Sequence, residues 1–172
     1  MKQETEEDML DFAKEVCQKY SRVKMLAEET QMQWRQDLEM AADSKYPGEK
    51  EMYDRQAEES LARYTALREW LKLADAAAFR IKDSKAQIVV RQHCLDRIPL
   101  KAVEFENGKH MGKTAVFYHK KIGLQQFSEE LFSSKAQMRQ LEKVLQKLNF
   151  TNGNEPFLNF SFLTVHRFFA IL

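Results

Sequence analysis

Glycine, proline and cysteine are scarce in this chain of 172 residues, which has five glycines, three prolines and two cysteines. So few helix-breaking residues, together with 44% hydrophobic and 31% charged residues, exclude a disordered protein. The two cysteines, Cys17 and Cys94, have no second thiol near them in the sequence, so neither a disulfide framework nor a zinc ribbon is predicted. We expect a folded, helix-rich protein of a reducing compartment.

Long apolar runs are also lacking. A helix that spans a bilayer needs about 20 apolar residues. The nearest candidate, residues 157–172, is shorter and contains Asn159, His166 and Arg167. The N-terminal residues are polar and acidic, unlike a secretory signal or a transit peptide. The sequence therefore predicts no membrane span and a cytoplasmic location, with the nucleus as the alternative.

A strong excess of charge of either sign is absent as well. The net charge is +1, which argues against a dedicated polyanion-binding protein. The charge is unevenly distributed, because residues 1–86 carry a net −4 and residues 87–172 a net +5. This asymmetry favours a head-to-tail alignment of chains or partners.

Residues 5–42 have the pattern of one long amphipathic helix. Thr5 is the expected N-cap, and the acidic residues that follow it suit the first turn of a helix. Pro47 and Gly48 mark the turn that ends the helix. At about 1.5 Å per residue, the helix would be roughly 55 Å long. Its apolar stripe, with steps of three and four and one double step, consists of Met9, Phe12, Val16, Tyr20, Val23, Leu26 or Ala27, Trp34, Leu38 and Ala41.

A second helical pattern starts near Glu49. It leaves open whether one helix continues to Ile98 or breaks near Asp83 and Ser84. With a short turn between them, the two helices are predicted to form a long, coiled-coil-like antiparallel hairpin over residues 1–98. The apolar stripe of the second helix comprises Ala57, Leu61, Tyr64, Leu67, Leu71, Ala74, Ala78, Ile81 and Ile88.

This hairpin has more apolar surface than two facing stripes can bury. The apolar residues beside the main stripe need a further covering surface. That surface is another part of this chain, a second copy, or a different protein, and the pattern does not choose between them. The residues concerned are Tyr53, Trp70, Leu73, Ala76 and Ala77.

Residues 99–172 are predicted to belong to the same structural unit and to begin with a small β-hairpin. Residues 102–106 and 114–119 have high β propensity and lie on either side of a turn that contains Asn107 and Gly108. This change of period after the long helices favours two short strands.

A third, shorter helix is predicted from Ser128 to the turn at residues 149–153, packed on the base of the long hairpin. The apolar tail that follows, residues 157–172, is expected to be either buried or adhesive. The stripe of the third helix comprises Leu131, Met138, Leu141, Leu145 and Leu148, with a polar gap at Ser134 and Lys135.

No motif predicts catalysis, a cofactor or a metal ion. Gly108, Gly112 and Lys113-Thr114 evoke a phosphate-binding loop, but three residues separate the two glycines where that loop has four. The expected strand after Thr114 also removes the helix N-terminus that such a loop needs. The four histidines lack ligand spacing, so we expect no catalytic, cofactor-binding or metal-binding residues.

A basic patch is the main competing feature. Lys109, Lys113, Lys120 and Lys121 lie in a stretch without acidic residues and alternate with aromatic side chains. Such a hairpin can hold a nucleic-acid backbone and stack on bases. Nucleic-acid binding is therefore an alternative function, and a nucleotide-binding enzyme centred on residues 104–121 is a less favoured one.

The preferred interpretation is a non-enzymatic scaffold or assembly subunit that binds a protein partner or a second copy through its amphipathic helices. The pattern does not separate interface from core within the stripes. The positions predicted to interact are Val23, Trp34, Leu38, Leu61, Leu67, Trp70 and Leu71.

Overall fold

The computed structural model describes residues 5–105 and 107–150. This part of the chain is mainly α-helical, as predicted, and contains no strand. The predicted apolar tail, residues 157–172, lies outside the described residues. The elements in chain order are α1 Glu6–Asp43, α2 Pro47–Phe79, α3 Ser84–Val89, the π-helix η1 Val90–Leu95, the 3-10 helix η2 Leu100–Ala102, α4 Lys113–Phe132 and α5 Lys135–Phe150.

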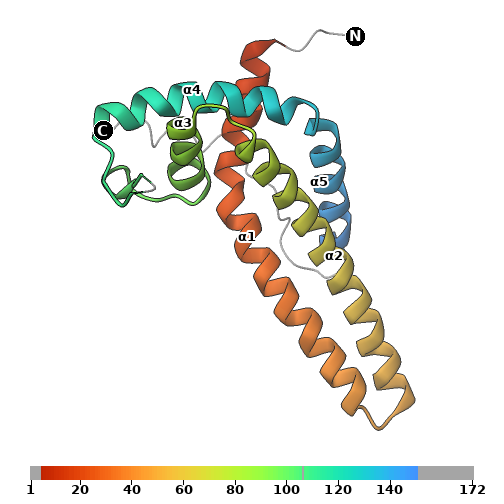
Figure 1. Ribbon diagram of the computed structural model, residues 1–172. Helices are drawn as coiled ribbons and strands as arrows, with labels where there is room; N and C mark the ends of the chain where they lie inside the picture. Colours follow the sequence, from red (N-terminus) through yellow and green to blue (C-terminus); the bar gives the residue numbers. More distant parts are fainter. Residues whose placement is uncertain (1–4, 106, 151–172) are drawn as a thin grey trace, which may run out of the picture.

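Helices α1 and α2 form the predicted long antiparallel hairpin (Figure 1). Thr5 begins α1 through a capping box, in which the Asp8 N–H donates to Thr5 Oγ1 at 3.2 Å and the Thr5 N–H donates to the Asp8 carboxylate at 3.0 Å. Helix α2 begins at Pro47, slightly before the predicted Glu49, because proline already has the backbone angle of a first helical turn. Both helix starts follow from the local sequence.

The second helical pattern breaks after Phe79. The Arg80 N–H bonds back to the carbonyls of the last turn, and α2 ends there. Asp83 then caps α3, because its carboxylate accepts a hydrogen bond from the Ala86 N–H at 2.8 Å. The π-helix η1 continues from α3, and Arg97 just beyond it has a left-handed backbone with φ of 60°. Of the two alternatives in the sequence, the broken helix is therefore the right one.

The predicted β-hairpin at residues 102–119 is wrong. A single isolated bridge joins Glu104 to His110, around a turn in which Gly108 has φ of 74°. The segment after this turn is the start of α4 and not a strand. Val116 in that first part of α4 is completely buried in a small apolar cluster with α3 and the preceding loop. Tertiary packing thus overrides the β propensity of these residues.

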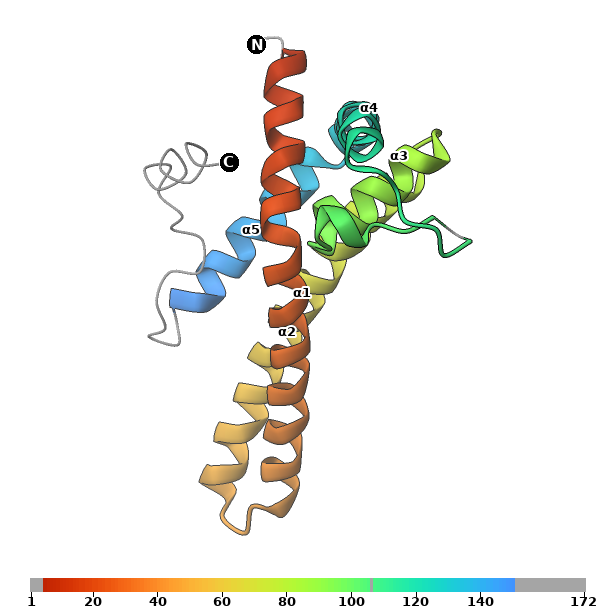
Figure 2. The same cartoon turned by 90° about the vertical axis from the view of Figure 1, so that its left-hand side faces the viewer.

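The predicted start of the third helix is also wrong. Ser128 lies inside α4, and the chain turns at Ser133 and Ser134 before α5 begins. The polar gap in the predicted stripe is therefore a turn between two helices. The stripe itself is right from Met138 onward, because Met138 and Leu145 are buried and α5 packs on α2 (Figure 2).

Helix α4 approaches α3 and η1 most closely at Gly123. A Cβ atom built on this glycine would lie 2.6 Å from Val90 Cγ2 and 2.9 Å from the backbone oxygen of Ala86. Carbon atoms do not approach each other this closely without strain, so the crossing requires a residue without a side chain.

One apolar core joins the hairpin to α4 and α5. It covers the half of the hairpin that contains the N-terminal part of α1 and the C-terminal part of α2. We call this covered half, together with α3, α4 and α5, the body of the protein. Here α4 and α5 supply the covering surface that the apolar residues of the hairpin need. The largest completely buried side chains of the core include Leu67 and Trp70 of α2, Phe127 and Leu131 of α4, and Met138 of α5.

A ring of four charged side chains ties α5 to α1. Arg139 donates to both carboxylate oxygens of Glu15, at 2.8 and 2.6 Å, and to Glu142 at 2.8 Å. Lys19 bonds to the same two carboxylates, so the charges alternate around the ring. Burial alone would raise the pKa of Glu15, but the hydrogen bonds from Arg139 and Lys19 outweigh it and hold that pKa below its ordinary value of 4.5.

Replacing Arg139 by glutamine is expected to lower the free energy of unfolding by about 1 to 2 kcal/mol at neutral pH. The effect is not larger because the Arg139 side chain is 40% exposed and solvent screens its charge. Because the pKa of Glu15 is lower in the folded chain, this stabilisation is present above pH 4.5 and is lost as the pH falls through the folded pKa. Urea unfolding of both proteins at neutral pH and at about pH 3 should show the difference shrinking in acid.

The matched control is Lys14→Gln, which removes an exposed ion pair to Asp11 at 2.8 Å. This variant should change the free energy of unfolding by no more than about 0.5 kcal/mol. An Arg139→Gln effect as small as that of Lys14→Gln would contradict the role of the ring.

Candidate functional site

Residues 28–62 form a projection of two helices, which we call the distal arm. It contains the last part of α1, the turn at residues 44–46 and the first part of α2. Figures 1 and 2 show that α3, α4 and α5 lie along the other half of the hairpin, whereas the arm extends beyond them. The arm is therefore a hairpin that the described remainder of the chain does not cover.

The interior of the arm is narrow and partly polar. Asp37 is 4% exposed, and its carboxylate accepts hydrogen bonds from Gln33 Nε2 at 2.8 Å and Ser60 Oγ at 2.9 Å. Small alanines, Ala41 and Ala57, are the other buried contacts nearer the tip. With such short side chains between them, the two helices approach closely and their larger apolar residues are left at the sides.

A stacked pair of rings marks the root of the arm. The rings of Trp34 and Tyr64 lie nearly parallel, with centroids 6.3 Å apart, and both side chains are half-buried. Next to them, Arg63 donates to the backbone oxygen of Leu148 at 3.2 Å, close to the point where α5 ends. Among the described residues, the contact of α5 with the hairpin thus ends near this stack.

The outer surface of the arm is unusually apolar for a solvated helix pair. Half of the large hydrophobic side chains that are exposed among the described residues belong to it, although it is a much smaller part of the chain. Exposed apolar groups gathered on one projection indicate a site of protein contact. The arm residues are Met32, Leu38, Met40, Tyr46, Met52 and Leu61.

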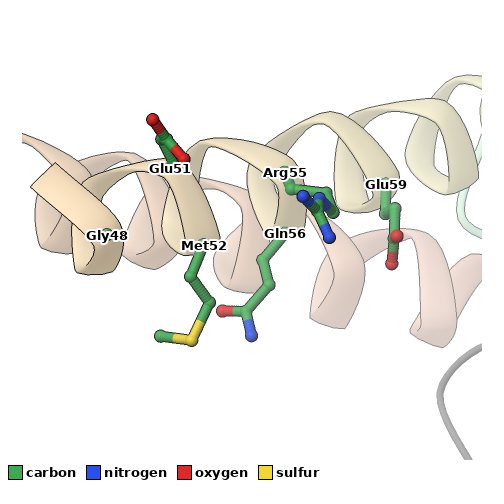
Figure 3. A pocket seen from close by; sticks show the side chains of 6 residues that line it. All are labelled: Gly48, Glu51, Met52, Arg55, Gln56 and Glu59. Atoms are coloured by element: carbon green, nitrogen blue, oxygen red, sulfur yellow. The ribbon is translucent and has the colours of Figure 1, made fainter.

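The arm is also acidic. It has ten acidic and four basic residues, a net charge of −6 in a chain whose total is +1. A hollow on its outer side is lined by Gly48, Glu51, Met52, Arg55, Gln56 and Glu59, all of them from α2 (Figure 3). A hollow formed by a single helix does not enclose a small molecule, so the chemistry of this surface suits a larger partner with basic and apolar groups.

The structure separates the predicted interaction residues into two groups. Trp34 is half-buried at the root of the arm, and Leu38 and Leu61 are 44% and 40% exposed on its sides. The other four are buried in the core of this chain, so they are not available to a partner in this structure. They are Val23, Leu67, Trp70 and Leu71.

The predicted basic patch lies on the loop before α4 and on α4 itself. Lys109, Lys113 and Lys121 are exposed, whereas Lys120 is half-buried with its Nζ 3.5 Å from His93 Nε2. The four lysines therefore do not form one open surface. Nucleic-acid binding by this patch stays a prediction.

One reason for excluding a phosphate-binding loop is wrong. A helix and not a strand follows Gly112, because α4 begins at Lys113. The spacing between Gly108 and Gly112 still departs from the phosphate-binding pattern. In the described part of the chain, no buried polar side chain points to a ligand at this helix start.

Two other kinds of site are absent from the described residues. In residues 5–105 and 107–150, the His, Cys, Asp and Glu side chains form no group of three that could hold a metal ion. The helices of the same residues include none whose length and apolar character would allow it to cross a membrane.

No family model, curated protein or solved structure matches this chain.

Proposed function

We propose that this chain is a non-enzymatic assembly subunit of the cytoplasm, and that its distal arm binds the basic surface of α4 on a second copy. The observation that carries the proposal is the uncovered arm, an acidic two-helix projection with exposed apolar side chains such as Leu38, Met52 and Leu61. Burying such side chains against a second helix is favourable by roughly 25 cal/mol per Å² of apolar surface.

The first half of α4 has the complementary chemistry. Lys113, Phe117 and Lys121 recur every four residues and so lie on one face of the helix. Phe117 is 49% exposed and Tyr118 64% exposed, and Lys113 Nζ lies 6.0 Å from the centre of the Phe117 ring. This surface offers aromatic area between positive charges, which matches apolar area between negative charges on the arm.

The two surfaces lie toward opposite ends of the molecule, with α4 across the body and the arm pointing away from it (Figure 1). A contact between two different surfaces of identical chains leaves one of each kind free in every dimer. The proposed association therefore adds further chains in the same direction, and the mean mass should rise with concentration beyond that of a dimer.

Replacing Leu38 and Leu61 together by serine is expected to weaken self-association by about tenfold or more, because each change removes apolar area from the contact. Sedimentation of the full chain over a concentration series measures this. Val144→Ser on α5 is the matched control, since Val144 is 39% exposed but lies outside the arm, and it should leave the association constant unchanged. A wild-type chain that stays monomeric throughout the series contradicts the proposal.

An exchange of charges tests which surfaces meet. Lys113→Glu with Lys121→Glu makes α4 acidic, and Glu39→Lys with Glu58→Lys makes the arm less acidic. Each double variant alone should associate about tenfold more weakly, because the α4 variant places like charges opposite each other and the arm variant reduces the attraction. An equimolar mixture should regain association, since each altered surface meets its complement on the other variant. A mixture that associates no better than its components would show that the arm and α4 are not partners.

A further inference from the structure

The only two cysteines of the chain meet in the core, although 76 residues separate them in the sequence. Cys17 of α1 is 6% exposed and Cys94 of η1 is 5% exposed, and both belong to the same apolar cluster. Each thiol lies near enough to the other to shift its pKa. The sequence gives no sign of this pair, because neither residue has a thiol neighbour along its own helix.

The surrounding contacts fix the register of α1 against η1. One turn after Cys17, Ser21 Oγ donates to the backbone oxygen of Leu95 at 2.8 Å. One turn further along, Lys24 Nζ lies 3.3 Å from the Asp96 carboxylate. Residues of α1 on one face therefore contact consecutive residues at the end of η1, which places Cys17 opposite Cys94.

The backbone around Cys94 is unusual. Cys94 lies in the last turn of the π-helix Val90–Leu95, a wide helix type that is rare in proteins and common at functional sites. Arg97, just beyond it, has φ of 60°, which costs free energy for a residue with a side chain. Cys94 therefore lies beside a locally strained backbone and belongs to the same core cluster as Cys17 of α1.

The two thiols differ in acidity. The hydrogen bond from Cys17, together with the positive charges of Lys120 and Arg97, lowers the pKa of Cys94 although burial acts in the opposite direction. The hydrogen bond to Cys94 and burial raise the pKa of Cys17 well above its ordinary value. Cys94 is thus the thiol of the pair that ionises first.

We propose that Cys17 and Cys94 form an oxidisable dithiol site, which a small peroxide converts into an intramolecular disulfide. The Cys94 thiolate attacks one peroxide oxygen, the O–O bond breaks, and hydroxide leaves and takes a proton to form water. Cys17 then attacks the sulfenic sulfur of Cys94 and the S–O bond breaks. The proton of Cys17 passes to the departing hydroxyl, so that a second water forms. Two thiols lose two electrons in total, and one peroxide gains them.

Burial selects the oxidant. At about one-twentieth exposure, neither sulfur is open to a bulky disulfide such as oxidised glutathione, whereas hydrogen peroxide is little larger than water. The product closes a large loop that joins α1 to η1, and such a cross-link restricts the unfolded chain. The oxidised protein should therefore unfold at a higher temperature than the reduced protein.

The test uses the full chain treated with hydrogen peroxide. Intact mass should fall by about 2 Da, the mass of two hydrogens, and titration in denaturant should find the loss of both thiols. Digestion without reductant should give one peptide pair linked through Cys17 and Cys94, and dithiothreitol should restore the original mass. Retention of both thiols, cross-links between chains, or oxygen addition without a cross-link would each overturn the proposal.

Single variants test the order of the two steps. In Cys17→Ser, Cys94 should stop at the sulfenic acid and be labelled by dimedone, whereas in Cys94→Ser the remaining Cys17 should stay unlabelled. Equal labelling of the two variants would overturn the assignment of Cys94 as the attacking thiol. The wild-type mass measurement stands independently of how well either variant folds.

Discussion

Replacing Trp70 by alanine is expected to lower the free energy of unfolding by about 3 to 5 kcal/mol, the largest effect that we expect from any single change in the chain. Trp70 is 1% exposed and lies in the core that α2 shares with α4 and α5. Alanine leaves a cavity that the surrounding helices fill only in part. Urea unfolding followed by circular dichroism measures the loss.

Leu61→Ala is the informative comparison, because both residues come from α2 and both are among the positions predicted to interact. Leu61 is 40% exposed on the arm, so its truncation should change the free energy of unfolding by about 0.5 kcal/mol or less. Equal losses in the two variants would contradict the division of the hairpin into a buried half and an uncovered arm.

Replacing Gly123 by alanine is expected to lower the free energy of unfolding by about 1 to 2 kcal/mol. Helix propensity alone favours alanine by about 1 kcal/mol. The new methyl group would lie 2.6 Å from Val90 Cγ2 and 2.9 Å from the Ala86 carbonyl, and overpacking of this kind costs typically 1 to 3 kcal/mol or more. The carbonyl is backbone and has little freedom to move away, so the clash outweighs the propensity.

Gly48→Ala provides the control for this prediction. Gly48 lies in the first turn of α2, and a Cβ there would have no other atom within 4 Å. The same substitution should therefore raise the free energy of unfolding slightly, by about 0.5 kcal/mol. Thermal unfolding of both variants shows whether each substitution stabilises or destabilises the protein. A stabilised Gly123→Ala would show that α4 does not pack closely on α3.

Local sequence was sufficient to predict a helix wherever the helix depends on its own capping residues and its own apolar stripe. The capping residue Thr5, the turn at Pro47 and the apolar stripe of α5 from Met138 onward all carry their information within a few residues. These elements could therefore be predicted. The start of α4 could not, because Val116 has β propensity and becomes helical only through its burial against another part of the chain.

The division of the hairpin into core and arm also depends on contacts distant in sequence. Leu67 and Leu61 have equal status in the same apolar stripe, and the position of α4 and α5 alone decides which of them is covered. Asp37 was missed because an acidic residue beside a stripe is normally solvated. The Cys17 and Cys94 pair could not be predicted because the two residues are far apart in the sequence.

The buried carboxylate of Asp37 has a consequence for the reach of the arm. Two helices that meet through alanines can slide by one turn at little cost, since each alanine resembles the next. A slide of this kind would separate Asp37 from Ser60 and leave the buried carboxylate with Gln33 of its own helix as the remaining donor. Only one alignment of the two helices gives the carboxylate both donors, so the arm acts as a spacer of fixed length.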